Sequence, residues 1–147
     1  MKYAHTNIIA RDWEKLSAFY IEVFECKTVP PIRNQSGHWL EEGTGITNAT
    51  LSGIHLALPG YGEDGPTLEI YTYKDFTETV KSQPNQLGFT HIAFEVEDVE
   101  KTLQRILENG GKRQGKVVTR VVEGKGEITF TYARDPEGNL IEIQNWK

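Results

Sequence analysis

Apolar and polar residues alternate over residues 2–10, and the apolar spacing then changes to three and four positions, which predicts a strand followed by a helix. Asp12 is the expected N-cap of this helix, which should run to about Cys26. Its buried face is expected to consist of Trp13, Leu16, Phe19, Tyr20, Val23 and Phe24. Further strands are predicted near Trp39, over 52–58 and over 66–73.

The same order of patterns returns after a polar stretch. Residues 74–87 contain Pro84-Asn85-Gln86 and are predicted to be a linker. A strand over 88–96 precedes a second helix, with Asp98 as its N-cap and Asn109-Gly110-Gly111 at its end. Three more strands are predicted over 116–122, 127–133 and 139–146, with a type I turn at 135–138.

The two halves keep the same register at their beginnings. His5 and His91 are 86 positions apart, and so are Asp12 and Asp98. Each half also closes on a similar strand, TLEIYTY in the first and NLIEIQNW in the second. The sequence therefore predicts an α+β fold made of a duplicated βαβββ unit. Residues 1–147 would form a single domain, with module 1–73 and module 88–147 joined by linker 74–87.

Composition and charge restrict the function to small-molecule chemistry. The chain has 147 residues, a net charge of -5 and one cysteine, and it shows no stripe of Lys and Arg. Nucleic-acid binding and attachment to an anionic membrane are therefore not expected. No apolar run is long enough for a membrane span, and the first residues do not resemble a signal peptide, so a cytoplasmic location is expected.

Strand alternation predicts which side chains share a face, because successive side chains in a strand point to opposite sides. In all four strands considered, the more apolar set is expected to face the helix. The opposite face then carries polar side chains from the first and last strands of each half. These are His5 and Asn7, Glu69 and Tyr71, His91, and Glu142 and Gln144.

Two histidines and two glutamates on one side suggest a metal site. Each residue alone would be interpreted as an ordinary hydrogen-bonding or solvated side chain. As a symmetric set of one His and one Glu from each half, they favour metal binding. Two imidazoles and two carboxylates suit a divalent ion such as Ni, Co, Zn, Mn or Fe.

Three segments resemble the vicinal oxygen chelate superfamily, which includes glyoxalase I, bleomycin resistance proteins and extradiol dioxygenases. They are HTNIIARDWEKLSAFYIEVF, GFTHIAFEVEDVEKTLQRILENGG and YARDPEGNLIEIQNW, and the resemblance extends over nearly the whole chain. It implies that the modules form a curled mixed sheet, a cup, around a metal held by His5, Glu69, His91 and Glu142. It also implies a homodimer.

The His-Glu-His-Glu set resembles that of bacterial glyoxalase I. That enzyme usually has an arginine and an asparagine, which help to hold glutathione, where this sequence has Ile9 and Tyr73. The segment 30–50, with Arg33, His38 and Trp39, also departs from the glyoxalase pattern and suggests a different substrate pocket.

The resemblance implies a metal-dependent lyase or isomerase acting through a metal-stabilised enediolate on a small oxygen-chelating substrate. Glu142 is the expected general base, and Glu69 is the expected partner that returns the proton. Asn7, Tyr71 and Gln144 are expected to line the substrate site. Use of glutathione is left open.

Two other functions remain possible on this fold. A ring-cleaving dioxygenase would use two histidines and one carboxylate, so Glu69 would be a fourth ligand in the way of substrate or O₂. A non-enzymatic module that binds a small molecule or antibiotic would not require the four residues. Three further residues are assigned no chemistry: His38 and His55 are expected to be structural or on the surface, and Cys26 is expected to pack at the end of the helix.

Overall fold

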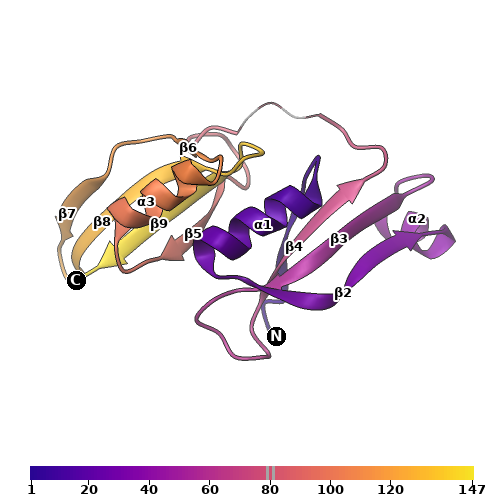
Figure 1. Ribbon diagram of the computed structural model, residues 1–147, viewed down its shortest axis with the longest axis horizontal. Coiled ribbons are helices and arrows are strands. Elements are labelled where there is room, and N and C mark those ends of the chain that lie inside the picture. Colours follow the sequence, from indigo (N-terminus) through magenta and orange to yellow (C-terminus); the bar gives the residue numbers. More distant parts are fainter. Residues whose placement is uncertain (79, 81) are drawn as a thin grey trace. The chain divides into compact units, whose positions relative to one another are not determined.

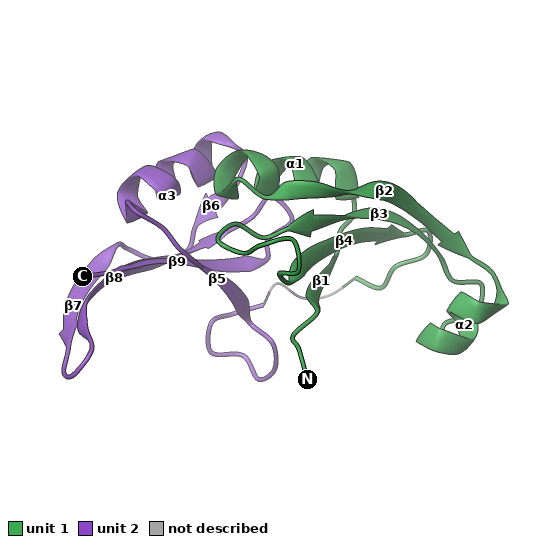
Figure 2. Cartoon of the chain, turned by 90° about the horizontal axis from the view of Figure 1, so that it is seen from below, with its two compact units in different colours: residues 1–79 green, residues 80–147 purple. Residues whose placement is uncertain are grey.

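The structure is a computed structural model that describes residues 1–78, 80 and 82–147 (Figure 1). The chain divides into two compact units, residues 1–79 and residues 80–147, which Figure 2 colours green and purple. The boundary falls within the predicted linker 74–87, of which positions 79 and 81 lie outside the described residues. The units are described separately below as unit 1 and unit 2.

Unit 1 is a four-stranded mixed sheet with one long helix on one face. Its elements are β1 (His5–Ile9), α1 (Trp13–Phe24), β2 (Lys27–Ser36), α2 (His38–Thr44), β3 (Thr50–Ala57) and β4 (Thr67–Tyr73). The strand order is β1-β4-β3-β2, with β1 parallel to β4 and the other pairs antiparallel. Helix α1 packs on β3 and β4 (Figure 2).

Unit 2 repeats this arrangement. Its elements are β5 (His91–Glu95), α3 (Val99–Glu108), β6 (Lys112–Arg113), β7 (Val118–Val122), β8 (Gly126–Arg134) and β9 (Leu140–Trp146). The order β5-β9-β8 matches β1-β4-β3, and β5 is parallel to β9. The outer place that β2 fills in unit 1 is shared by β6 and β7, which pair with different parts of β8. The predicted α+β fold with a duplicated βαβββ unit is confirmed.

Both long helices begin with the same hydrogen bond, as their sequences predict. The Asp12 carboxylate accepts from the backbone N–H of Lys15 at 3.1 Å, and Asp98 accepts from Lys101 at 3.0 Å. Each bond satisfies a donor that the first helical turn leaves without a partner.

Between α1 and the sheet, the core consists of Leu16, Phe19, Tyr20, Val23, Phe24, Leu56, Leu68 and Ile70.

Removing the second cap provides a test of this local assignment. The Asp98→Ala variant is expected to lose about 1 kcal/mol of unfolding free energy, because the N–H of Lys101 then lacks its partner. A lower urea midpoint with an unchanged slope would show this effect. Asp75→Ala, which removes an exposed carboxylate outside any helix, is the matched control and should leave the midpoint unchanged.

Segment 27–44 corrects the sequence analysis. The strand predicted near Trp39 is wrong, because Trp39 lies in α2 and is largely exposed. The strand that was missed is β2, whose sequence KTVPPIRNQS contains two prolines and is mostly exposed. Proline is compatible with β2 because β2 is the outer strand of the sheet, where one edge needs no backbone donors.

No helix among the described residues is long and apolar enough to cross a membrane.

Candidate functional site

Two of the four predicted metal ligands, His5 and Glu69, lie beside each other on the sheet of unit 1. Parallel pairing places Asn7 of β1 beside Glu69 of β4, so His5 and Glu69 share the face opposite α1. The Nδ1 atom of His5 lies 3.3 Å from Oε1 of Glu69. The Glu69 side chain is 13% exposed and that of His5 is 47% exposed. The carboxylate is thus largely shielded, while the imidazole can still be reached from solvent.

A third side chain, His55 of β3, joins this pair. The antiparallel register places His55 directly opposite Glu69. Its Nε2 atom lies 3.1 Å from the same Oε1 atom and 2.6 Å from the hydroxyl oxygen of Tyr71. Burial lowers the pKa of His55, which favours the neutral imidazole at neutral pH. His55 is therefore part of the cluster around Glu69, a contact that the sequence analysis missed.

Tyr71 was predicted to line a substrate site, and the structure places it in a packed position. It is 7% exposed and packs with Leu40, Ala49 and Leu51. Burial raises the pKa of its hydroxyl, so the group stays protonated. Because the hydroxyl contacts His55, Tyr71 links the apolar cluster to the imidazole beside Glu69.

The other two predicted ligands, His91 and Glu142, lie beside each other in the same way in unit 2. Nε2 of His91 on β5 lies 3.2 Å from Oε2 of Glu142 on β9. Tyr132 of β8 is opposite Glu142 in the register, as His55 is opposite Glu69 in unit 1. Its ring meets the His91 ring edge-on at 5.1 Å. Burial and hydrogen bonding to Glu142 raise the pKa of Tyr132, so the phenol acts as a donor to the carboxylate.

The two remaining predicted residues lie beside these glutamates. Asn7 is exposed on β1, next to Glu69 in the register. Gln144 is half-buried on β9, between Glu95 of β5 and Phe130 of β8. Their amides are thus on the same faces as the two imidazole–carboxylate pairs.

The structure brings His5 together with Glu69 and His91 together with Glu142, and the two pairs belong to different units. Within residues 1–78, 80 and 82–147, no three His, Cys, Asp or Glu side chains have an arrangement that would hold a metal ion. The four-residue metal set therefore stays a prediction.

The donor chemistry of each pair fits a divalent ion. Each pair places an imidazole nitrogen within 3.3 Å of a carboxylate oxygen. Two ligands bound at about 2.1 Å to one ion are about 3.0–3.4 Å apart, so these separations are compatible with shared coordination. Nitrogen and carboxylate donors suit borderline or hard divalent ions.

The other singled-out residues have no such role. His38 is exposed and pairs with Glu41 and Glu42 on its own helix, as expected for a surface residue. Cys26 is buried after the end of α1, and burial raises the pKa of its thiol to about 12. A thiol with such a pKa is not a ready nucleophile or metal ligand.

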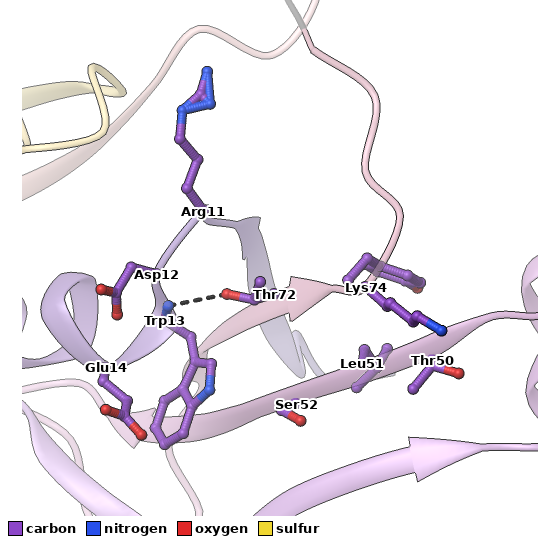
Figure 3. A pocket seen from close by; sticks show the side chains of 10 residues that line it. Arg11, Asp12, Trp13, Glu14, Thr50, Leu51, Ser52, Thr72 and Lys74 are labelled. Atoms are coloured by element: carbon purple, nitrogen blue, oxygen red, sulfur yellow. Dashed lines mark hydrogen bonds between the residues drawn. The ribbon is translucent and has the colours of Figure 1, made fainter.

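A separate groove of about 340 Å³ lies beside the beginning of α1 in unit 1. Figure 3 shows Trp13 on one side and Lys74 on the other, with Thr72 between them. The hydroxyl oxygen of Thr72 accepts a hydrogen bond from the backbone N–H of Trp13, and charged residues of both signs line the groove. None of the predicted site residues lines it, so the candidate site is the imidazole–carboxylate pairs.

Comparisons with known proteins relate this chain to glyoxalase-type proteins. A family model described as the Glyoxalase/Bleomycin resistance protein/Dioxygenase superfamily matches residues 2–143. Uncharacterized protein YwkD of Bacillus subtilis is 25% identical over 139 residues, which are 95% of this chain and 92% of that protein. A lactoylglutathione lyase of Salmonella typhimurium is 27% identical over 146 residues, with coverages of 97% and 91%. The crystal structure of a glyoxalase family protein from Bacillus cereus matches with a TM-score of 0.77 at 20% identity, with coverages of 99% and 93%.

Proposed function

Since the chain belongs to the glyoxalase/bleomycin resistance protein/dioxygenase superfamily, we propose that it is a metal-dependent lyase or isomerase acting on a small oxygen-chelating substrate. The observation that carries the proposal is the repeated imidazole–carboxylate pair, His5 with Glu69 and His91 with Glu142. Similarity to a lactoylglutathione lyase over nearly the whole chain supports the reaction class. The homodimer and the cytoplasmic location expected from the sequence belong to the same proposal.

Four residues would hold the metal: His5, Glu69, His91 and Glu142. A bound Ni, Co, Zn, Mn or Fe ion would act as a Lewis acid toward two neighbouring substrate oxygens and make the adjacent carbon more acidic. His55 beside Glu69 and Tyr132 beside Glu142 would fix the orientation of the two carboxylates, as partners of metal ligands commonly do.

The residues of the chain itself would carry the proton. Glu142 would take it from the substrate carbon, because its carboxylate is 14% exposed and contacts one imidazole. Glu69 would give a proton back to the substrate, and exchange with water would remove the proton from Glu142 and restore the one on Glu69. The amides of Asn7 and Gln144 would orient the substrate by hydrogen bonds.

Metal content is the experiment that tests the proposal. Protein purified without chelators is expected to contain a divalent ion in near-stoichiometric amount by plasma mass spectrometry. His91→Gln should lose most of the metal, because the replacement amide is a poor ligand. His38→Gln changes an exposed histidine that pairs only with surface glutamates among its described contacts, and it should retain the metal.

The outcome also separates the alternatives. Bound Ni, Co, Zn or Mn would be followed by isomerase assays on thiohemiacetals of 2-oxoaldehydes and on acyl thioesters. Bound iron together with O₂ uptake on catechols would contradict the isomerase and favour a dioxygenase. Absence of metal even after incubation with each ion would contradict the proposal and leave a module that only binds small molecules.

A further inference from the structure

Arg33 of β2 lies on the same face of the unit 1 sheet as the cluster around Glu69. The register aligns Arg33 with Gly53 of β3, and Gly53 with Tyr71 of β4. Glu69 and Tyr71 are two positions apart on β4, so they point to the same side. The row that contains Arg33 is therefore next to the row that contains His55 and Glu69.

The guanidinium of Arg33 is held in place by uncharged partners. Its Nη1 atom donates to the backbone oxygens of Val29 at 2.9 Å and Pro31 at 2.6 Å. The Pro31 carbonyl is available because the register shifts between Val29 and Arg33, and the residues between them do not pair with β3. Neutral carbonyl groups fix the side chain without cancelling its charge.

The remaining donors of this guanidinium, Nε and Nη2, have no partner among the described residues, and no described carboxylate pairs with Arg33. The side chain is half-buried, so water compensates its charge only in part.

We propose that Arg33 binds an anionic group of the substrate, so that the substrate class is a small oxygen-chelating compound carrying a carboxylate. This inference rests on the proposed function. Nε and Nη2 of a guanidinium form a fork that matches the two oxygens of a carboxylate. A carboxylate bound there would supply the counter-charge that the half-buried cation lacks.

Two hydroxamates of equal shape and different charge test this directly. Succinic acid monohydroxamate has a carboxylate arm, and its primary amide has the same arm without the charge. Both present two neighbouring oxygens that chelate a metal. Calorimetry on the nickel-loaded, full-length protein is expected to show about tenfold tighter binding of the carboxylate, as for a partly shielded charge-assisted contact.

Three variants assign the preference to the residue. Arg33→Gln keeps a donor for the backbone carbonyls and removes the charge, so the preference should disappear. Arg33→Lys should retain part of it. Arg120→Gln, which removes the same charge from an exposed position on β7, should keep the full preference.

Failure of the proposed role of Arg33 can be distinguished from failure of the proposed function. Equal affinity for the two hydroxamates, or a preference that survives Arg33→Gln, would overturn the role of Arg33 and leave the metal site intact. If the protein retains no nickel and binds neither hydroxamate, the proposed function and this inference are both wrong.

Discussion

Replacing Glu142 with glutamine is expected to slow proton removal from the substrate carbon by about 10²–10⁴-fold, the gain that a positioned general base typically supplies. Glutamine has nearly the same shape and can still accept a hydrogen bond from Tyr132, but its amide does not accept a proton at neutral pH. The measurement is exchange of the substrate α-proton with D₂O, followed by NMR. The substrate would be the thiohemiacetal or acyl thioester that the wild-type protein converts.

The variant also removes a proposed metal ligand, so the rates must be compared per bound metal ion. Glu123→Gln is the matched control, because Glu123 is exposed in the turn between β7 and β8. It should exchange the proton as fast as the wild type. If Glu142→Gln exchanged the proton at the wild-type rate per metal ion, Glu142 would not be the base.

The two carboxylates differ in their contacts. Oε1 of Glu69 is within 3.3 Å of two imidazole nitrogens, from His5 and His55. Oε2 of Glu142 is close to one imidazole, at 3.2 Å, and its carboxylate accepts from Tyr132. Each carboxylate therefore has two polar neighbours, so the exchange rate of Glu142→Gln decides whether Glu142 is the base.

The two long helices, α1 and α3, and their caps could be predicted from the sequence because local chemistry determines them. Asp12 and Asp98 each place a side-chain oxygen at the N–H three residues later, and the apolar spacing fixes the face that is buried. Strand β2 could not be found this way. Because β2 is the outer strand, it needs no alternation of apolar and polar residues, and it can contain Pro30 and Pro31. The sequence of β2 therefore lacks both usual signs of a strand, which are alternation and the absence of proline.

The site was predictable to the extent that strand alternation determines it. Alternation alone places His5, Glu69, His91 and Glu142 on the faces away from the helices, and in each unit the histidine lies beside the glutamate. The contact of His55 with Glu69 depends on the register between β3 and β4. The long connection over residues 58–66 leaves that register unspecified in the sequence.

The turn between β8 and β9 is shorter than the connection between β3 and β4, and it specifies the register of its two strands. Gly138 donates to the backbone oxygen of Asp135 at 3.0 Å, which is the bond expected of the predicted type I turn. The Asp135 carboxylate also accepts from the N–H groups of Glu137 and Asn139. Counting outward from this turn gives the pairing of Tyr132 with Glu142. The signal for Tyr132 was therefore present, although a tyrosine in a strand suggests core packing first.

Replacing Gly53 with alanine is expected to lower the unfolding free energy by about 3 kcal/mol, at the upper end of the range for overpacking. A Cβ atom at this position would lie 2.1 Å from the backbone oxygen of Ile70 and 2.4 Å from Cδ1 of Tyr71. Both distances are shorter than any non-bonded contact allows. The Ile70 oxygen belongs to the sheet backbone, so it cannot move aside as the end of a flexible side chain could. For a chain of this size the loss corresponds to a decrease in Tm of about 6–12 °C.

The damage should extend to the site, because the ring of Tyr71 lies against Gly53 and its hydroxyl contacts His55. Gly43→Ala is the matched control, since no atom of the described residues lies within 4 Å of a Cβ atom there and α2 favours alanine over glycine. It should leave Tm unchanged or raise it slightly. Calorimetric melting of the two variants measures the difference, and equal Tm values would show that the Ile70 backbone and the Tyr71 ring can both move away from Gly53 without cost. In that case the contact between Tyr71 and His55 would not be a fixed support for Glu69.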